Sequence, residues 1–219
     1  MTKYLLIALF AVAIFSIVSY FFSINLLYKR RSNKSINYKN EFPFESVPYF
    51  KTTGSNLNLL LFLSLTATLA GFALFTVNYF GVIPLLMTIV FTLMGFFIGA
   101  LPFVSLAKIK EHLYMVVGAI VSDFLISALI TYLSYSVSKM YDYQKISPII
   151  AIVISAILLI KSIFFILNPK LFNLRYVKNE KDELVRPKFV PLAFYEWSVL
   201  VSSPIYLLVL MLLSTAIVK

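Results

Sequence analysis

The feature that most constrains this chain is a series of apolar runs, each long enough to cross a lipid bilayer as a helix. A crossing helix needs about 20 mostly apolar residues. Within lipid the backbone polar groups must bond inside their own segment, so such runs are predicted to be helices. The runs that reach this length cover residues 4–28, 57–77, 82–106, 113–138, 147–167 and 192–218. The sequence therefore predicts an all-α, polytopic integral membrane protein, a bundle of six transmembrane helices in a single domain spanning residues 1–219.

Composition supports a lipid-embedded chain. Hydrophobic residues make up 61% of it and charged residues 13%, against about 45–50% and about 25% in soluble domains. A water-soluble core could not enclose this excess, so we expect lipid to solvate much of it. The chain has no Cys and only one His, which excludes disulfides, thiolate zinc sites and multi-histidine metal sites. We expect no metal site and no cofactor.

The positive charges are concentrated in alternate loops. Of the 19 Lys and Arg residues, 14 lie in the segments 29–56, 107–112 and 168–191. Cytoplasmic loops carry an excess of Lys and Arg, so these loops are predicted to lie inside and both termini outside. The net charge of +10 is then a topology signal, and we expect no nucleic-acid partner. Richness in Lys, Phe, Ile and Asn suggests an AT-rich genome, so we expect a prokaryotic cytoplasmic membrane.

Small and polar residues on two predicted helices indicate where the helices touch. Small residues allow backbones to approach closely, and hydroxyl groups bond between helices. Within 82–106 and within 113–138 such residues recur at spacings of three or four, which keeps each set on one helical face. The predicted packing residues are Thr88, Thr92, Gly95, Gly99, Ser127, Thr131 and Ser134. We expect the second, third and fourth segments to form the tightest part of the bundle.

One acidic residue, Asp123, lies deep in the fourth segment. At about 1.5 Å per residue it is about 15 Å inside the membrane, near the middle of a hydrocarbon core about 30 Å thick. An ionised Asp there costs about 2.5–3.5 kcal/mol, so we expect it to be neutral or paired with a cation. It is either a structural contact between helices or a site that couples ion, proton or substrate movement.

Two further charged residues lie at neighbouring depths on other segments. Lys161 is long enough to pair with Asp123 or with Glu196, or to extend to the lipid headgroups instead. Glu196 lies between Tyr195 and an adjacent Trp, a pair typical of the membrane interface, so we expect it to be near water. The single histidine, His112, is expected to be an ordinary boundary residue.

Sequence motifs for catalysis are absent. The chain contains no G-x-S-x-G nucleophile motif, no phosphate-binding G-x-x-x-x-G-K-[ST] and no dinucleotide-binding G-x-G-x-x-G. We therefore expect that the protein is not an enzyme. The favoured function is a non-catalytic subunit or a protective interaction partner of a membrane assembly, in contact with the bilayer and with another membrane protein. The alternative is a small ion- or solute-transporter or channel component that uses Asp123.

Overall fold

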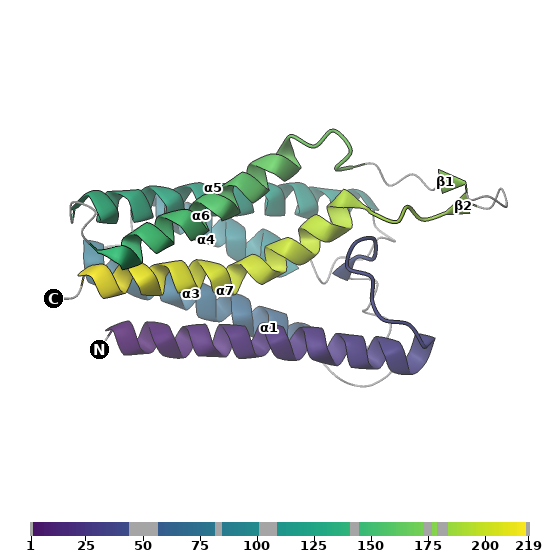
Figure 1. Ribbon diagram of the computed structural model, residues 1–219, viewed down its shortest axis with the longest axis horizontal. Coiled ribbons are helices and arrows are strands. Elements are labelled where there is room, and N and C mark those ends of the chain that lie inside the picture. Colours follow the sequence, from purple (N-terminus) through teal and green to yellow (C-terminus); the bar gives the residue numbers. More distant parts are fainter. Residues whose placement is uncertain are drawn as a thin grey trace.

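The computed structural model describes residues 2–43, 57–81, 85–100, 109–140, 145–172, 177–178 and 184–217. The helices lie lengthwise beside one another, and α1 begins at the same end of the bundle where α7 ends (Figure 1). The helices are α1 (Thr2–Ser32), α3 (Asn58–Phe80), α4 (Leu85–Leu93), the π-helix η2 (Met94–Ile98), α5 (Ile109–Met140), α6 (Ile146–Ile166) and α7 (Pro191–Ile217). A small hairpin pairs β1 (Val177–Lys178) antiparallel with β2 (Leu184–Val185).

Five helices, α1, α3, α5, α6 and α7, are long and apolar enough to cross a membrane, which supports a multi-pass membrane protein. The third predicted segment contains α4 and η2, which together form a shorter apolar helix, Leu85–Ile98. The two ends of that segment, 82–84 and 101–106, lie outside the described residues. A sixth crossing and the N-out, C-out orientation therefore stay predictions.

The last helix, α7, is the centre of the bundle. It contacts α1, α3, α5 and α6, and 18 of its 27 residues are buried. The other extensive contacts join α1 to α3 and α5 to α6. The expectation that the second, third and fourth segments pack most tightly is wrong for the second and third, because α3 touches η2 only narrowly among the described residues. The third and fourth do pack together, since α5 contacts both α4 and η2.

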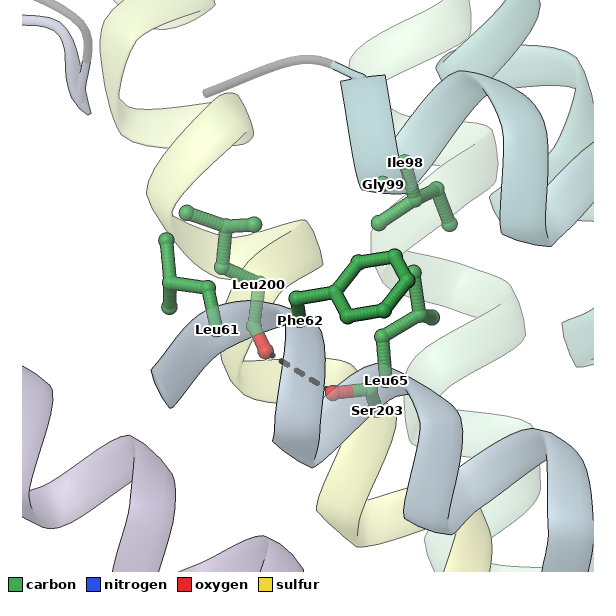
Figure 2. Close-up of a pocket in the computed structure, with 7 residues that line it drawn as sticks. All are labelled: Leu61, Phe62, Leu65, Ile98, Gly99, Leu200 and Ser203. Carbon is green, nitrogen blue, oxygen red and sulfur yellow. Dashed lines mark hydrogen bonds between the residues drawn. The ribbon is translucent and has the colours of Figure 1, made fainter. Parts of the chain in front are cut away.

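A proline inside α7 shapes its contact with α3. Pro204 has no N–H, so the Leu200 carbonyl four residues earlier loses its usual helical partner. The Ser203 hydroxyl donates to that carbonyl at 3.2 Å, and Thr68 of α3 donates to the Ser203 carbonyl at 3.1 Å. Figure 2 shows the Ser203–Leu200 bond beside a small, mainly apolar cavity of about 10 Å³, room for about one water. Ser203 thus fills the carbonyl that Pro204 leaves free, and the Thr68 bond adds a separate polar link between α3 and α7.

Candidate functional site

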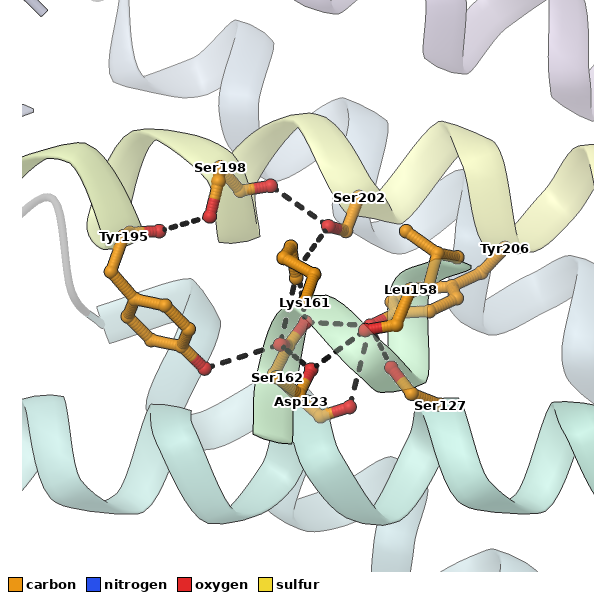
Figure 3. A network of polar contacts seen from close by, with 9 residues as sticks. All are labelled: Asp123, Ser127, Leu158, Lys161, Ser162, Tyr195, Ser198, Ser202 and Tyr206. Atoms are coloured by element: carbon orange, nitrogen blue, oxygen red, sulfur yellow. Dashed lines mark hydrogen bonds and ion pairs between the residues drawn. The ribbon is translucent and has the colours of Figure 1, made fainter. Parts of the chain in front are cut away.

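The Asp123 carboxylate is fully buried at the centre of a polar network between α5, α6 and α7 (Figure 3). Its Oδ1 accepts the Tyr206 hydroxyl at 2.6 Å and lies 3.2 Å from Lys161 Nζ. Its Oδ2 accepts the hydroxyls of Ser162 at 2.5 Å and Tyr195 at 3.1 Å, and Lys161 Nζ lies 3.1 Å away. A carboxylate offers about four lone-pair directions, so these donors fill its accepting capacity.

Lys161 supplies the opposite charge. Its Nζ also donates to Ser202 Oγ at 2.7 Å, and it lies 5.9 Å from the centroid of the Tyr195 ring, within cation–π range. Its side chain is 18% exposed, whereas that of Asp123 is not exposed at all. From the sequence, Lys161 could pair with Asp123, pair with Glu196 or extend to the lipid headgroups. The structure places it against Asp123. A buried ion pair offsets its desolvation cost only when further hydrogen bonds satisfy the lone pairs and N–H groups that the pair itself leaves over.

The polar groups of α7 reach this network because they share one helical face. Successive members of this set are three or four residues apart, so their side chains lie along one side of the helix. The set is Tyr195, Ser198, Ser202 and Tyr206. Ser198 donates to the Tyr195 carbonyl at 2.7 Å and Ser202 donates to the Ser198 carbonyl at 2.8 Å. The Tyr206 hydroxyl also lies 3.0 Å from Ser127 Oγ on α5. The sequence analysis did not predict this stripe. The same search for polar residues at spacings of three or four, extended from 113–138 to 192–218, finds it.

A second pair of ionisable side chains joins α5 to α7 nearer one end of the bundle. His112 Nε2 lies 3.2 Å from Glu196 Oε1, and both side chains are almost fully buried, at 4% and 1% exposed. His112 is therefore more than a boundary residue, and the expectation that Glu196 lies near water is wrong. The structure does not bring Glu196 to Lys161, because its carboxylate faces His112 instead.

Glu196 is buried because the segment after α1 folds over this end of α7. Trp197 Nε1 donates to the Glu41 carbonyl at 2.7 Å, and the Trp197 ring packs edge-on against Tyr38, with centroids 4.9 Å apart. The Phe42 ring lies edge-on to His112, 6.3 Å between centroids. The aromatic residues beside Glu196 thus face protein, not headgroups, which single-sequence spacing could not reveal.

The predicted packing residues on α5 lie where the stripe placed them. Ser127 and Ser134 are fully buried and Thr131 is partly buried. Two of the three hydroxyls bond within their own helix: Thr131 donates to the Ser127 carbonyl at 2.7 Å and Ser134 to the Ile130 carbonyl at 2.8 Å. Such local bonds satisfy the hydroxyl without a neighbouring helix, so only Ser127 bonds directly to α7.

Only half of the stripe predicted on the third segment lies against another helix. Thr88 and Thr92 are exposed, which contradicts their expected packing role. A Cβ on Gly95 would lie 3.2 Å from Leu69, and one on Gly99 would lie 3.0 Å from Leu65, so the glycines do approach α3. The π-helix η2 (Met94–Ile98) explains the difference. Its i→i+5 bonding takes more residues per turn, so the α-helical spacing test breaks down across it.

Comparison with family models, with curated proteins and with solved structures finds no match to this chain. Among the described residues, no group of three His, Asp or Glu side chains is placed to hold a metal ion. The absence of a metal site or cofactor stays a prediction. The groups at hand can hold a charge pair, bond across helices and exchange protons among Asp123, Lys161 and the two tyrosines.

Proposed function

We propose that this chain is a non-catalytic integral membrane protein that serves as a subunit or interaction partner of a membrane assembly. The observation that supports this proposal is the closed network around Asp123. Its carboxylate is fully buried and its accepting capacity is filled by Lys161, Ser162, Tyr195 and Tyr206. A group held in this way fastens helices together, whereas a substrate or transported ion needs a free ligand position.

An outward face of α6 is the surface we propose for the partner. Ile157, Ile160 and Phe164 are 60%, 65% and 66% exposed, and their spacings of three and four place them on one side of the helix. Shape complementarity, polar bonds and lipid entropy drive helix association in membranes. Lys161, next to this face and 18% exposed, offers a polar contact to an incoming helix.

Site-specific photo-crosslinking in native membranes tests this function. A benzoylphenylalanine at Ile160 is expected to yield one protein adduct of discrete mass. The same probe at Leu86, 63% exposed on α4, is expected to yield lipid adducts only. If neither position, nor Phe15 on the exposed side of α1, captures a protein, the partner function is contradicted.

Transport is a second candidate, favoured by one observation. The pairs His112–Glu196 and Asp123–Lys161 both involve α5, and Glu196 and Tyr195 both belong to α7. His112 and Asp123 are three helical turns apart, about 16 Å along the axis. Ionisable residues within membrane helices often mark proton relays. Ion or proton flux into proteoliposomes distinguishes the two functions. If the protein is a transporter, the Asp123→Asn variant stays folded and loses the flux. If it is an interaction partner, no flux depends on Asp123.

A further inference from the structure

Two segments far apart in the sequence lie side by side at one end of the bundle. Val190 N–H donates to the Lys39 carbonyl at 2.8 Å. Asn40 Nδ2 donates to the Pro187 carbonyl at 3.1 Å, and Arg186 Nη1 donates to the Asn40 carbonyl at 3.1 Å. These bonds hold the segment 37–40 against the segment 186–190, immediately before α7 begins at Pro191.

This arrangement places two exposed lysines on neighbouring segments. Lys39 is bonded through its backbone to Val190, two residues after Lys188, and both lysines are exposed. Among the described residues, neither side chain makes an ion pair. The nearest acid on this segment, Glu41, bonds to other groups: its Oε1 accepts the Tyr28 hydroxyl and its Oε2 the Asn37 N–H, each at 2.8 Å. Two exposed lysines on segments that are hydrogen-bonded to each other favour a bound anion.

An apolar surface begins directly beside the two lysines. Phe189 is 49% exposed and Phe194 is 40% exposed, with ring centroids 5.8 Å apart. Phe194 in turn lies 6.0 Å from Phe165 of α6, whose neighbour Phe164 is 66% exposed on the outward face of that helix. Two exposed rings, Phe189 and Phe194, therefore lie beside the lysine-bearing segments and lead toward α6.

We propose that Lys39 and Lys188 form the headgroup site of an anionic phospholipid. Its phosphate lies between the two lysine side chains, and its acyl chains lie over Phe189 and Phe194, apart from the α6 face proposed for the partner. Charge complementarity calls for an anion, and the adjoining apolar rings call for one attached to hydrocarbon. Lysines at a membrane surface each strengthen attraction to anionic lipid, and a long lysine side chain reaches the headgroup level while its stem stays apolar.

Native mass spectrometry of the full-length protein in detergent, titrated with dioleoyl-phosphatidylglycerol or dioleoyl-phosphatidylcholine, tests the site. We expect the wild-type protein to bind phosphatidylglycerol more tightly. The double variant Lys39→Gln/Lys188→Gln is expected to lose that preference, with phosphatidylglycerol affinity lower by on the order of tenfold. Both lysines are exposed, so its thermal unfolding should match that of the wild type.

Lys3→Gln is the matched control, because Lys3 is an exposed lysine on α1 at the opposite end of the bundle. It is expected to keep the lipid preference. Equal binding of both lipids by the wild type, an unchanged preference in the double variant, or an equal loss in Lys3→Gln would each overturn the proposal. Glycerol phosphate, which lacks acyl chains, should not displace the lipid, and displacement at similar concentration would assign the site to soluble anions instead.

Discussion

Lys161 Nζ lies 3.1 Å from Asp123 Oδ2, and this contact ties α6 to α5 where both meet the polar face of α7. Ser202 and Tyr206 of α7 complete the link, the first by accepting from Lys161 and the second by donating to Asp123. Breaking a buried pair by removing one partner typically costs about 3–5 kcal/mol, because the other charge remains buried. The pair is therefore a fastening among three helices as well as the main chemical feature of the bundle.

Gly118 is the position where added volume should do most harm. A Cβ there would lie 2.2 Å from Cδ1 and 2.4 Å from Cγ of Phe97, a rigid ring that cannot bend aside. We expect Gly118→Ala to lower the thermal unfolding temperature in detergent more than Gly95→Ala, whose Cβ meets only the tip of Leu69 at 3.2 Å. Adding Phe97→Leu should recover part of the loss. Equal losses from the two glycine variants would show that α5 does not pack against Phe97 in this way.

The predicted orientation is open to labelling, since the chain has no Cys. Single cysteines replace Ser35, Phe172 and Met140, all of which are exposed. With an impermeant thiol reagent on intact cells we expect reaction at position 140 only, because the Lys- and Arg-rich loops are predicted inside. Permeabilised cells provide the control in which all three react. Labelling of position 35 or 172 in intact cells would reverse the orientation.

The His112–Glu196 pair should matter for stability. We expect His112→Phe to lower the free energy of unfolding by about 3 kcal/mol, because a buried carboxylate loses the imidazole that faces it. Glu196→Gln should cost less, since the amide keeps an oxygen toward His112 and buries no charge. Glu111→Gln, at an exposed acid one residue before His112, is the control and should be neutral. Denaturant unfolding in detergent measures all three, and an unaffected His112→Phe would show the pair to be dispensable.

Ser203 should stabilise α7 mainly because Pro204 follows it. Its hydroxyl donates to the Leu200 carbonyl, which the proline leaves without a helical partner. We expect Ser203→Ala to cost about 1 kcal/mol, and to cost distinctly less in a Pro204→Ala background, where a backbone N–H takes over. Thermal unfolding of the two single variants and the double variant checks this, and an equal cost in both backgrounds would contradict it.

Five of the six predicted helices match long apolar helices of the structure, because apolar length alone defines them. The predicted run 147–167 corresponds to Ile146–Ile166, and 192–218 to Pro191–Ile217. In contrast, the relative placement of the helices depends on which faces meet, and lipid and protein contacts look equally apolar in a sequence. The sequence therefore does not predict the central position of α7, although the serines and tyrosines of α7 are spaced like the stripe predicted on α5.

The Asp123–Lys161 part of the site was predictable, because a charge buried in a membrane helix needs a partner. A deep Asp needs a partner, and few cations are within reach, so Lys161 stood out. His112 and Glu196 were misjudged for a physical reason. Their burial depends on Glu41 and Phe42, about 70 and 155 residues away along the chain, folding over the end of the bundle. Likewise, Thr88 and Thr92 were placed in an interface by an α-helical spacing that the π-helix after them does not follow.

The most direct test of the account is a double-variant cycle on Asp123 and Lys161, measured as free energy of unfolding in one detergent. We predict that Asp123→Asn and Lys161→Met each destabilise the protein, by up to about 3–5 kcal/mol where a charge is left buried alone. The double variant should be more stable than the sum of the two losses implies, because it leaves neither charge behind. Asp123→Asn that unfolds like the wild type, with a double variant showing no coupling, would contradict the fastening role of the pair.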